Sequence, residues 1–102
     1  MSITQQILEE GKKVQIQISG RFDYGASQEF RDAYRHLPDV DGIRFCVDLS
    51  EASYMDSSAL GMLLLLREHA KSQGGEVVIE KPGEQIDKIL KVANFEQLFT
   101  IN

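Results

Sequence analysis

Cysteine and long apolar runs are scarce in this sequence. Its single cysteine, Cys46, cannot form an intramolecular disulfide or a cysteine-based zinc cluster, and this usage is typical of a reducing compartment. The longest unbroken apolar run, residues 62–66, is far shorter than the roughly 20 residues that a membrane-spanning helix needs. Residues 1–10 lack the basic start and the continuous apolar core of a signal peptide. These absences predict a cytoplasmic protein that is not inserted into a membrane.

Positive charge is also in short supply. The chain has 16 acidic and 11 basic residues, a net charge of −5, and its longest basic run is the pair at 12–13. A protein that follows a phosphate backbone needs a basic patch or stripe, so nucleic acid is not an expected partner. With 102 residues and 42% hydrophobic content, the chain suffices for one core and is too short for two ordinary domains. We therefore expect one globular domain, residues 1–102.

The sequence does contain alternating strand and helix patterns. Apolar residues at every second position predict half-buried strands, whereas apolar spacings of three and four predict amphipathic helices. On these patterns, strands are expected at 3–8, 14–19, 43–49, 76–80 and 98–101, and helices at 26–37, 57–73 and 82–93. Pro82 is expected in a first helical turn, and the glycine pair at 74–75 is expected to end the middle helix.

The order of these elements predicts an α/β fold. Strands joined through helices should be parallel, whereas the first two strands should form an antiparallel hairpin. The strands at 14–19 and 43–49 each have one polar face, so helices should cover mainly one face of a mixed, mostly parallel sheet of four or five strands. Loops predicted at 20–23 and 50–58 follow these strands, at the edge where binding groups collect. If the two strands are neighbours, Asp23 and Ser57 belong to one surface.

Polar residues at the start of the apolar helix are the candidate functional site. The first N–H groups of a helix lack intrahelical partners, and its dipole favours negative charge by ~0.3 to 1 kcal/mol, so a phosphate on Ser57 could be held there. The phosphate would add about −1.5 to −2 charges beside Asp56 and Asp23 and would repel a partner that docks on the neutral loop. A simpler interpretation is that Asp56 or Ser57 only caps the helix, which is worth about 1 kcal/mol. Local sequence alone favours the cap.

Two segments resemble a known family. Residues 48–61, DLSEASYMDSSALG, closely resemble the phosphorylation-site signature of bacterial anti-sigma factor antagonists, the STAS-domain family. Residues 19–23, SGRFD, are similar to the Gly-x-Leu/Phe-Asp element of that family, and the likeness extends to the glycine pair and the Leu-Phe-x-Ile ending. The resemblance implies a STAS-like fold in which Ser57, directly after the motif aspartate, accepts a phosphate. Ala59 departs from the pattern, because many members have glycine there.

The resemblance also implies a mechanism and its partners. In the family, the unphosphorylated domain binds an anti-sigma factor, often itself the serine kinase, and thereby frees a sigma factor; phosphorylation releases the partner, and a serine phosphatase of the PP2C type removes the phosphate. We therefore expect a partner-switching module for transcription regulation, with no enzymatic activity, cofactor or metal. The expected partner-binding residues are Asp23, Asp56, Ser57, Ser58 and Met62. The alternative is a constitutive STAS subunit of a transport or signalling complex, in which Ser57 is only a helix cap.

The apolar residues of the serine helix divide into two groups. Leu60, Leu63 and Leu64 are predicted to face the core, and Leu66 is also expected inside. Met62 and Leu65 either belong to the core too or leave part of an apolar patch that a partner covers.

Readings based on other reactive residues are weaker. His36 and His69 are expected to be surface histidines, and Cys46 an inert, partly covered thiol. Asp48 and Lys81 invite comparison with a response regulator, but no adjacent acidic pair follows the early strand. A serine hydrolase would need a Gly-x-Ser-x-Gly elbow, which the chain lacks.

Overall fold

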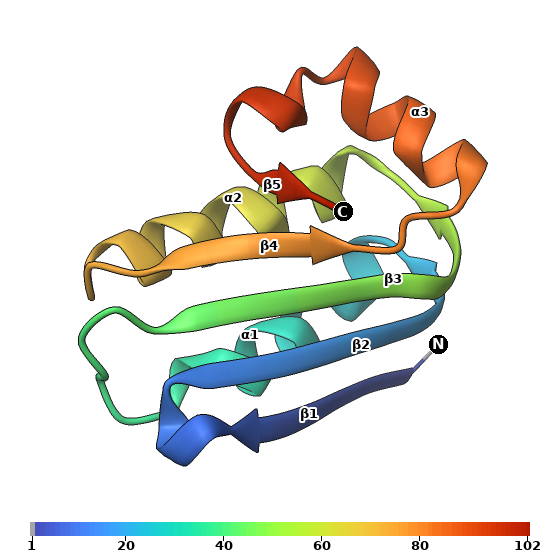
Figure 1. The fold of residues 1–102 in the computed structure, drawn as a ribbon. Coiled ribbons are helices and arrows are strands. Elements are labelled where there is room, and N and C mark those ends of the chain that lie inside the picture. The colour runs from blue at the N-terminus through green and yellow to red at the C-terminus, as the bar shows by residue number, and fades with distance from the viewer. Residues whose placement is uncertain (1) are drawn as a thin grey trace.

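The fold is a mixed five-stranded sheet with helices, seen in a computed structural model that describes residues 2–102 (Figure 1). The strands lie in the order β1-β2-β3-β4-β5; β1 is antiparallel to β2, and the others pair in parallel. The strands are β1 (Ser2–Leu8), β2 (Lys13–Phe22), β3 (Arg44–Met55), β4 (Glu76–Glu80) and β5 (Thr100–Ile101). The α-helices are α1 (Ser27–Arg35), α2 (Ser57–Lys71) and α3 (Glu84–Val92). The predicted α/β fold and antiparallel hairpin are confirmed.

The core lies between the sheet and the helices. Helices α1 and α2 lie behind the sheet in Figure 1, no helix crosses its front face, and α3 lies at the β4–β5 end. The alternating apolar residues of the central strands face the helices and are almost fully buried: Val14, Ile16 and Ile18 of β2, and Phe45, Val47 and Leu49 of β3. The expected one-sided arrangement is therefore confirmed.

The open face of the sheet is polar. The Gln15 side-chain amide donates a 2.9 Å hydrogen bond to Glu80, and the Asp48 carboxylate accepts one of 2.8 Å from the Ser50 N–H. Cys46 lies on this face and is only 2% exposed, so its predicted partial exposure was wrong. Burial raises the pKa of the Cys46 thiol, and the Glu80 carboxylate adds to the rise. The thiol is therefore held in its protonated, unreactive form.

Strands β2 and β3 run further than their sequence patterns predicted. Two register shifts, one near Gly20, keep the strands paired until Phe22 lies opposite Met55, and both of these side chains are buried. Gly20 has a φ of +86°, which only glycine adopts without strain, and this allows the strand to bend and continue. The predicted loop at 50–58 is instead mostly strand, and only Asp56 separates β3 from α2.

Helix α2 buries a different face from the one predicted. Leu64 is 38% exposed, so its predicted inward position was wrong, while Leu60 is half-buried. Leu65 is 57% exposed, whereas Met62 is buried and contributes little to the surface. Residues 62–66 are all apolar and therefore carry no information about helical phase. The buried residues of α2 are Ala59, Met62, Leu63, Leu66 and Ala70.

The C-terminal elements are shorter than predicted. Gly83 is the extended N-cap of α3 and Pro82 precedes it, so the prediction of Pro82 in the first turn was wrong. Asn94 has a left-handed φ of +59° just after α3, as suits a helix stop. The predicted strand at 98–101 is reduced to β5 because a 3-10 turn occupies 95–97. Within residues 2–102, no helix has the length and apolar character needed to cross a membrane.

The two histidines differ in environment. His36 is exposed and lies 3.6 Å from Asp32, as expected of a surface histidine. His69 is instead half-buried, with its ring centroid 5.0 Å from that of Tyr34 and 6.0 Å from that of Phe45. Helix α1 and strand β3 thus cover it, which the spacing within its own helix did not reveal.

Candidate functional site

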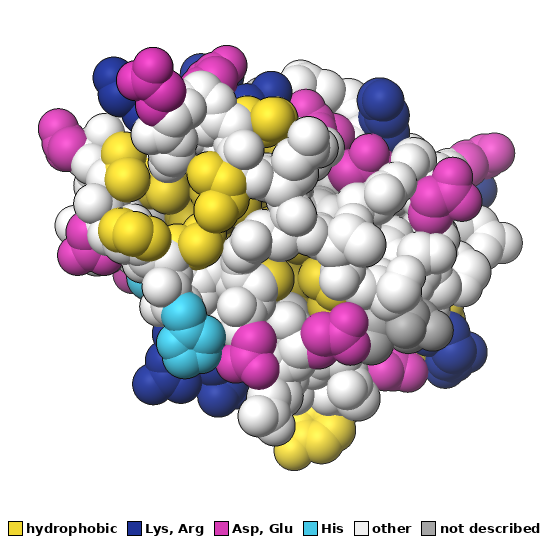
Figure 2. All heavy atoms as spheres, turned by 90° about the horizontal axis from the view of Figure 1, so that it is seen from below, with side chains coloured by type: hydrophobic (Ala, Val, Ile, Leu, Met, Phe, Trp, Pro, Cys, Tyr) yellow, Lys and Arg dark blue, Asp and Glu magenta, His cyan; other side chains and the backbone are white. Residues whose placement is uncertain are grey.

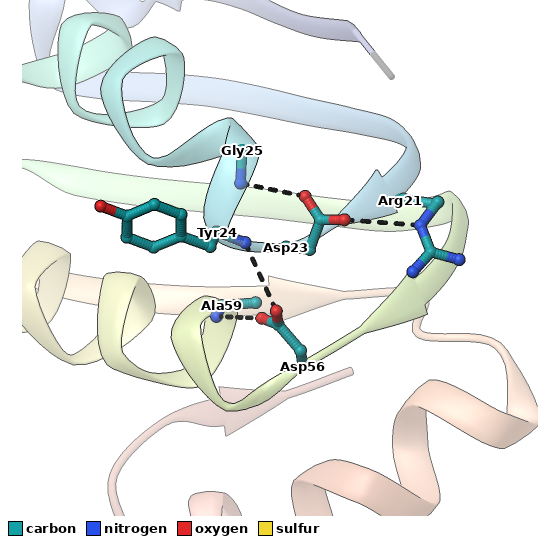
Figure 3. A network of polar contacts seen from close by, with 6 residues as sticks. All are labelled: Arg21, Asp23, Tyr24, Gly25, Asp56 and Ala59. Atoms are coloured by element: carbon teal, nitrogen blue, oxygen red, sulfur yellow. Dashed lines mark hydrogen bonds and ion pairs between the residues drawn. The ribbon is translucent and has the colours of Figure 1, made fainter.

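The carboxyl ends of β2 and β3 form one surface. The strands are neighbours, their last residues Phe22 and Met55 are register partners, and the Asp56 N–H donates to the Phe22 carbonyl at 3.4 Å. Asp23 and Asp56 therefore follow directly on two paired residues and lie close together (Figure 3). Asp23 and Ser57 were predicted to share a surface if these two strands are neighbours, and the strands do pair with each other.

Asp56 joins the start of α2 to the turn that follows β2. Its backbone is extended, and its Oδ1 accepts a 2.9 Å hydrogen bond from the Ala59 N–H, which makes it the N-cap. Its Oδ2 accepts a longer bond, 3.4 Å, from the Tyr24 N–H (Figure 3). The two carboxylate oxygens of Asp56 therefore link the first turn of α2 to the turn that follows β2.

Asp23 has an equivalent role in its own turn. Its Oδ1 accepts a 3.1 Å hydrogen bond from the Gly25 N–H, and its Oδ2 lies 3.4 Å from Arg21 Nε. The Arg21 guanidinium carbon lies 4.1 Å from the centre of the Tyr54 ring, a cation–π contact across β2 and β3. The negative charge of Asp23 is therefore compensated locally.

The two serines occupy different environments at the helix start. Ser57 is the first residue of α2 and is exposed, whereas Ser58 is half-buried. Ala59 is fully buried and belongs to the core, so its methyl group does not cover the hydroxyl of Ser57. Asp56 accepts a hydrogen bond from the Ala59 N–H. The N–H groups of Ser57 and Ser58 also belong to the first helical turn, whose backbone donors lack intrahelical partners.

Sequence reasoning missed three residues of this surface. Arg21 and Tyr54 become neighbours only through the register shifts between β2 and β3, which no local pattern reveals. Tyr24 is 75% exposed, and an aromatic residue in a loop beside the Gly-x-Phe-Asp element is the one signal that could have suggested it.

Met62, predicted to contact a partner, is 7% exposed and lies on the buried face of α2. Residues 2–102 contain no cluster of three His, Cys, Asp or Glu side chains that could hold a metal ion.

Replacement of Asp56 tests its role in stability. Asp56→Ala removes the cap and the link to Tyr24, so the free energy of unfolding should fall by about 1 to 2 kcal/mol. Asp56→Asn retains an oxygen that can cap and should cost less than Asp56→Ala. Urea unfolding followed by circular dichroism measures both variants, and equal stability of Asp56→Ala and the parent chain would contradict the assignment.

Comparison with known proteins identifies the family of this chain. The family model described as "Mlab, STAS domain" matches residues 6–100. The chain is 48% identical over 102 residues to a STAS-domain containing protein of Pseudomonas aeruginosa, and the match covers all of both chains. It is 24% identical over 103 residues to the anti-sigma-B factor antagonist of Bacillus subtilis, covering 100% of this chain and 93% of that protein.

A solved structure shares the fold. The phosphorylated form of the Bacillus cell-fate determinant SpoIIAA superimposes with a TM-score of 0.73 at 15% identity, covering 99% of this chain and 91% of that chain. The fold is thus that of anti-sigma factor antagonists, although STAS domains also occur in transporters. From the family match and the full-length relative, the chain belongs to the STAS-domain family.

Proposed function

We propose that this chain is an anti-sigma factor antagonist whose binding to its partner is switched by phosphorylation of Ser57. The observation that carries the proposal is an exposed hydroxyl on the first residue of α2, directly after the capping aspartate. The similarity to the anti-sigma-B factor antagonist supports the same function. The motif resemblance supports Ser57, rather than its neighbour, as the acceptor.

In this proposal the chain is a substrate and not a catalyst. Both oxygens of Asp56 already accept backbone hydrogen bonds, so this carboxylate positions the turn. A partner kinase supplies the base that takes the proton from Ser57 Oγ, and the nucleotide whose γ-phosphoryl group forms the new O–P bond as the bond to ADP breaks. The free N–H groups and the dipole of α2 then favour the phosphate.

The switch follows from charge. Arg21 offsets the charge of Asp23, whereas Asp56 is held only by backbone N–H groups. A phosphate adds about −1.5 to −2 charges there, and a partner seated on the hydroxyl meets both repulsion and the cost of removing water from the new charge. The partner in this proposal is an anti-sigma factor that is also the serine kinase; its release restrains the sigma factor, and a PP2C-type phosphatase reverses the change.

Phosphate mapping tests this function. Incubation of the chain with its cognate kinase and ATP should add one phosphate, which tandem mass spectrometry should place on Ser57. Ser57→Ala should remove the modification, whereas Ser58→Ala should retain it because Ser58 is the less accessible hydroxyl. Phosphate on another residue, or none, contradicts the proposal.

An affinity pull-down from the native cell separates the alternative function. Recovery of a serine kinase that modifies Ser57 supports the switch. Recovery of transporter subunits, with no kinase, supports a constitutive STAS subunit in which Ser57 only begins the helix.

A further inference from the structure

A shallow groove between α1 and α2 is lined by hydrogen-bond donors and one exposed leucine. Its volume is about 290 Å³, comparable to the smallest small-molecule sites. The lining residues are Arg31, Tyr34 and Arg35 of α1 and Leu65 and His69 of α2, and none of them is acidic. His69 lies about 18 Å beyond the first residue of α2 along the helix axis, so this groove is separate from the proposed phosphorylation site.

The two arginines of the groove are unpaired, unlike the other arginines of the chain. Of the five arginines, Arg21, Arg44 and Arg67 each lie within 4.0 Å of a carboxylate oxygen. Within residues 2–102, no carboxylate oxygen lies that close to Arg31 or Arg35. These two are four positions apart on one face of α1, where like charges repel and destabilise a helix. An anion bound between them would remove that repulsion.

His69 adds a donor whose identity its neighbours determine. The Gln73 side-chain oxygen accepts a 2.8 Å hydrogen bond from the Val40 N–H, so the amide nitrogen is the atom that lies 3.1 Å from His69 Nε2. Because this nitrogen donates, Nε2 accepts and the ring proton lies on Nδ1. Nδ1 has no hydrogen-bond partner in the described chain, where no buried side-chain nitrogen or oxygen lacks one, so solvent reaches it. The Nδ1–H is therefore available to a ligand in the groove.

Tyr34 supplies a further donor from α1. Its ring is buried, but its hydroxyl has no partner among residues 2–102 and, by the same argument, reaches solvent. Burial raises the pKa of Tyr34, and the nearby charges of Arg31 and Arg35 oppose the rise. The hydroxyl is therefore protonated near neutral pH and can donate to a ligand.

These donors and charges fit a phosphate group. A guanidinium binds phosphate oxygens through paired N–H donors, and two guanidinium charges match the roughly −1.5 to −2 of a phosphate monoester, whereas a carboxylate has only one charge. Leu65 is 57% exposed and gives the groove an apolar wall. We infer that the groove between α1 and α2 binds a small phosphate monoester, with its phosphate group on Arg31 and Arg35 and its organic part against Leu65.

Another hollow of the molecule differs in charge and should not bind this ligand. It has a volume of about 340 Å³ and is lined mostly by apolar side chains, among them Ile7, Leu37 and Val40, and Figure 2 shows a hydrophobic cluster on that face. Its one charged lining residue is Glu10, which repels a phosphate group. An aromatic ring alone can enter such a hollow, so phenol is the control for binding through the ring.

NMR titration of the ¹⁵N-labelled chain with phenyl phosphate tests the inference. Backbone amides around Arg35 and His69 should shift saturably, and phenol at the same concentration should leave them unmoved. Inorganic phosphate should shift the same amides but bind about 5-fold to 10-fold more weakly, because it has no organic part to pack against Leu65. All titrations are made at one ionic strength, since salt screens exposed charges.

Arginine variants test whether the groove holds the phosphate. Arg31→Gln and Arg35→Gln should each weaken phenyl phosphate binding by about 10-fold, because each removes a charged hydrogen-bond donor. Arg44→Gln removes the same charge at the start of β3, where Arg44 is paired with Glu76, and should change the dissociation constant by less than about twofold. Thermal unfolding confirms that the three variants fold.

Each outcome decides the inference. Saturable binding that both groove variants weaken and Arg44→Gln retains supports it. Equal affinity for phenyl phosphate and inorganic phosphate overturns the monoester, and equal weakening by Arg31→Gln and Arg44→Gln, or no shift near the groove, overturns the site. A phosphoserine peptide that binds at least 10-fold more tightly than phenyl phosphate assigns the groove to a protein and overturns the small ligand. None of these results depends on modification of Ser57, so the proposed function is tested separately.

Discussion

Ser57→Asp should weaken binding of the chain to the proposed anti-sigma factor partner by roughly 100-fold, because like charges brought together at an interface cost several kcal/mol. The new carboxylate lies at the first position of α2, beside Asp56 and close to the turn that contains Asp23. There it imitates part of the charge of a phosphate. The fold should be unaffected, since Ser57 is exposed and the dipole favours an acidic residue in the first helical turn. Calorimetric titration with the purified partner measures the loss.

Ser57→Asn is the matched control for charge. It has the size and shape of aspartate without the charge, so it should bind within a few-fold of the parent chain and yet accept no phosphate. Ser57→Asp binding as tightly as Ser57→Asn contradicts an electrostatic switch. Equal weakening by both indicates instead that the partner needs the small hydroxyl itself.

Gly75→Ala should lower the free energy of unfolding by about 3 kcal/mol or more, a large part of the roughly 5 to 15 kcal/mol typical of a domain. A Cβ at Gly75 would lie 1.9 Å from the carbonyl oxygen of Ile43, and the next nearest atoms are also backbone. This carbonyl cannot move aside easily, because it accepts the 3.0 Å hydrogen bond from Glu76 where β3 and β4 begin to pair. Chemical unfolding monitored by circular dichroism measures the loss.

Gly61→Ala is the control for the added methyl group. Gly61 lies inside α2, and a Cβ there would meet no atom within 4 Å. Alanine favours a helix interior over glycine, so this variant should gain about 0.5 to 1 kcal/mol. A Gly75→Ala variant as stable as the parent chain would show that the backbone near Ile43 adjusts, contrary to the close packing described above.

The fold was predictable to the extent that its signals are local. The alternation in β2 and β3 is a property of each segment alone, and it identified both the strands and the face that the helices cover. Residues 50–55 are polar or exposed along most of their length, so no such signal reported that they continue β3. Their strand conformation comes from pairing with β2, which bends at Gly20.

The candidate site was predictable in part for the same reason. Asp56 and Ser57 could be placed at a helix start because a capping residue before an apolar run is a local signal. The assignment of Ser57 as a phosphate acceptor came from the family resemblance and stays a prediction. The outward position of Leu64 could not be predicted from the sequence, because the five consecutive apolar residues 62–66 are compatible with any orientation of the helix toward the core.

The sequence by itself determined the order of strands and helices, the one-sided core, and a helix start with a capping residue at Asp56 or Ser57. The tertiary structure alone decided that Asp56 also holds the Tyr24 turn, that Arg21 stacks on Tyr54, and that Arg35 and His69 share a groove. The physical reason is that periodicity and capping act within a few residues, whereas these contacts join segments far apart in the chain. Their geometry depends on strand register and helix packing, which form only when the whole core assembles.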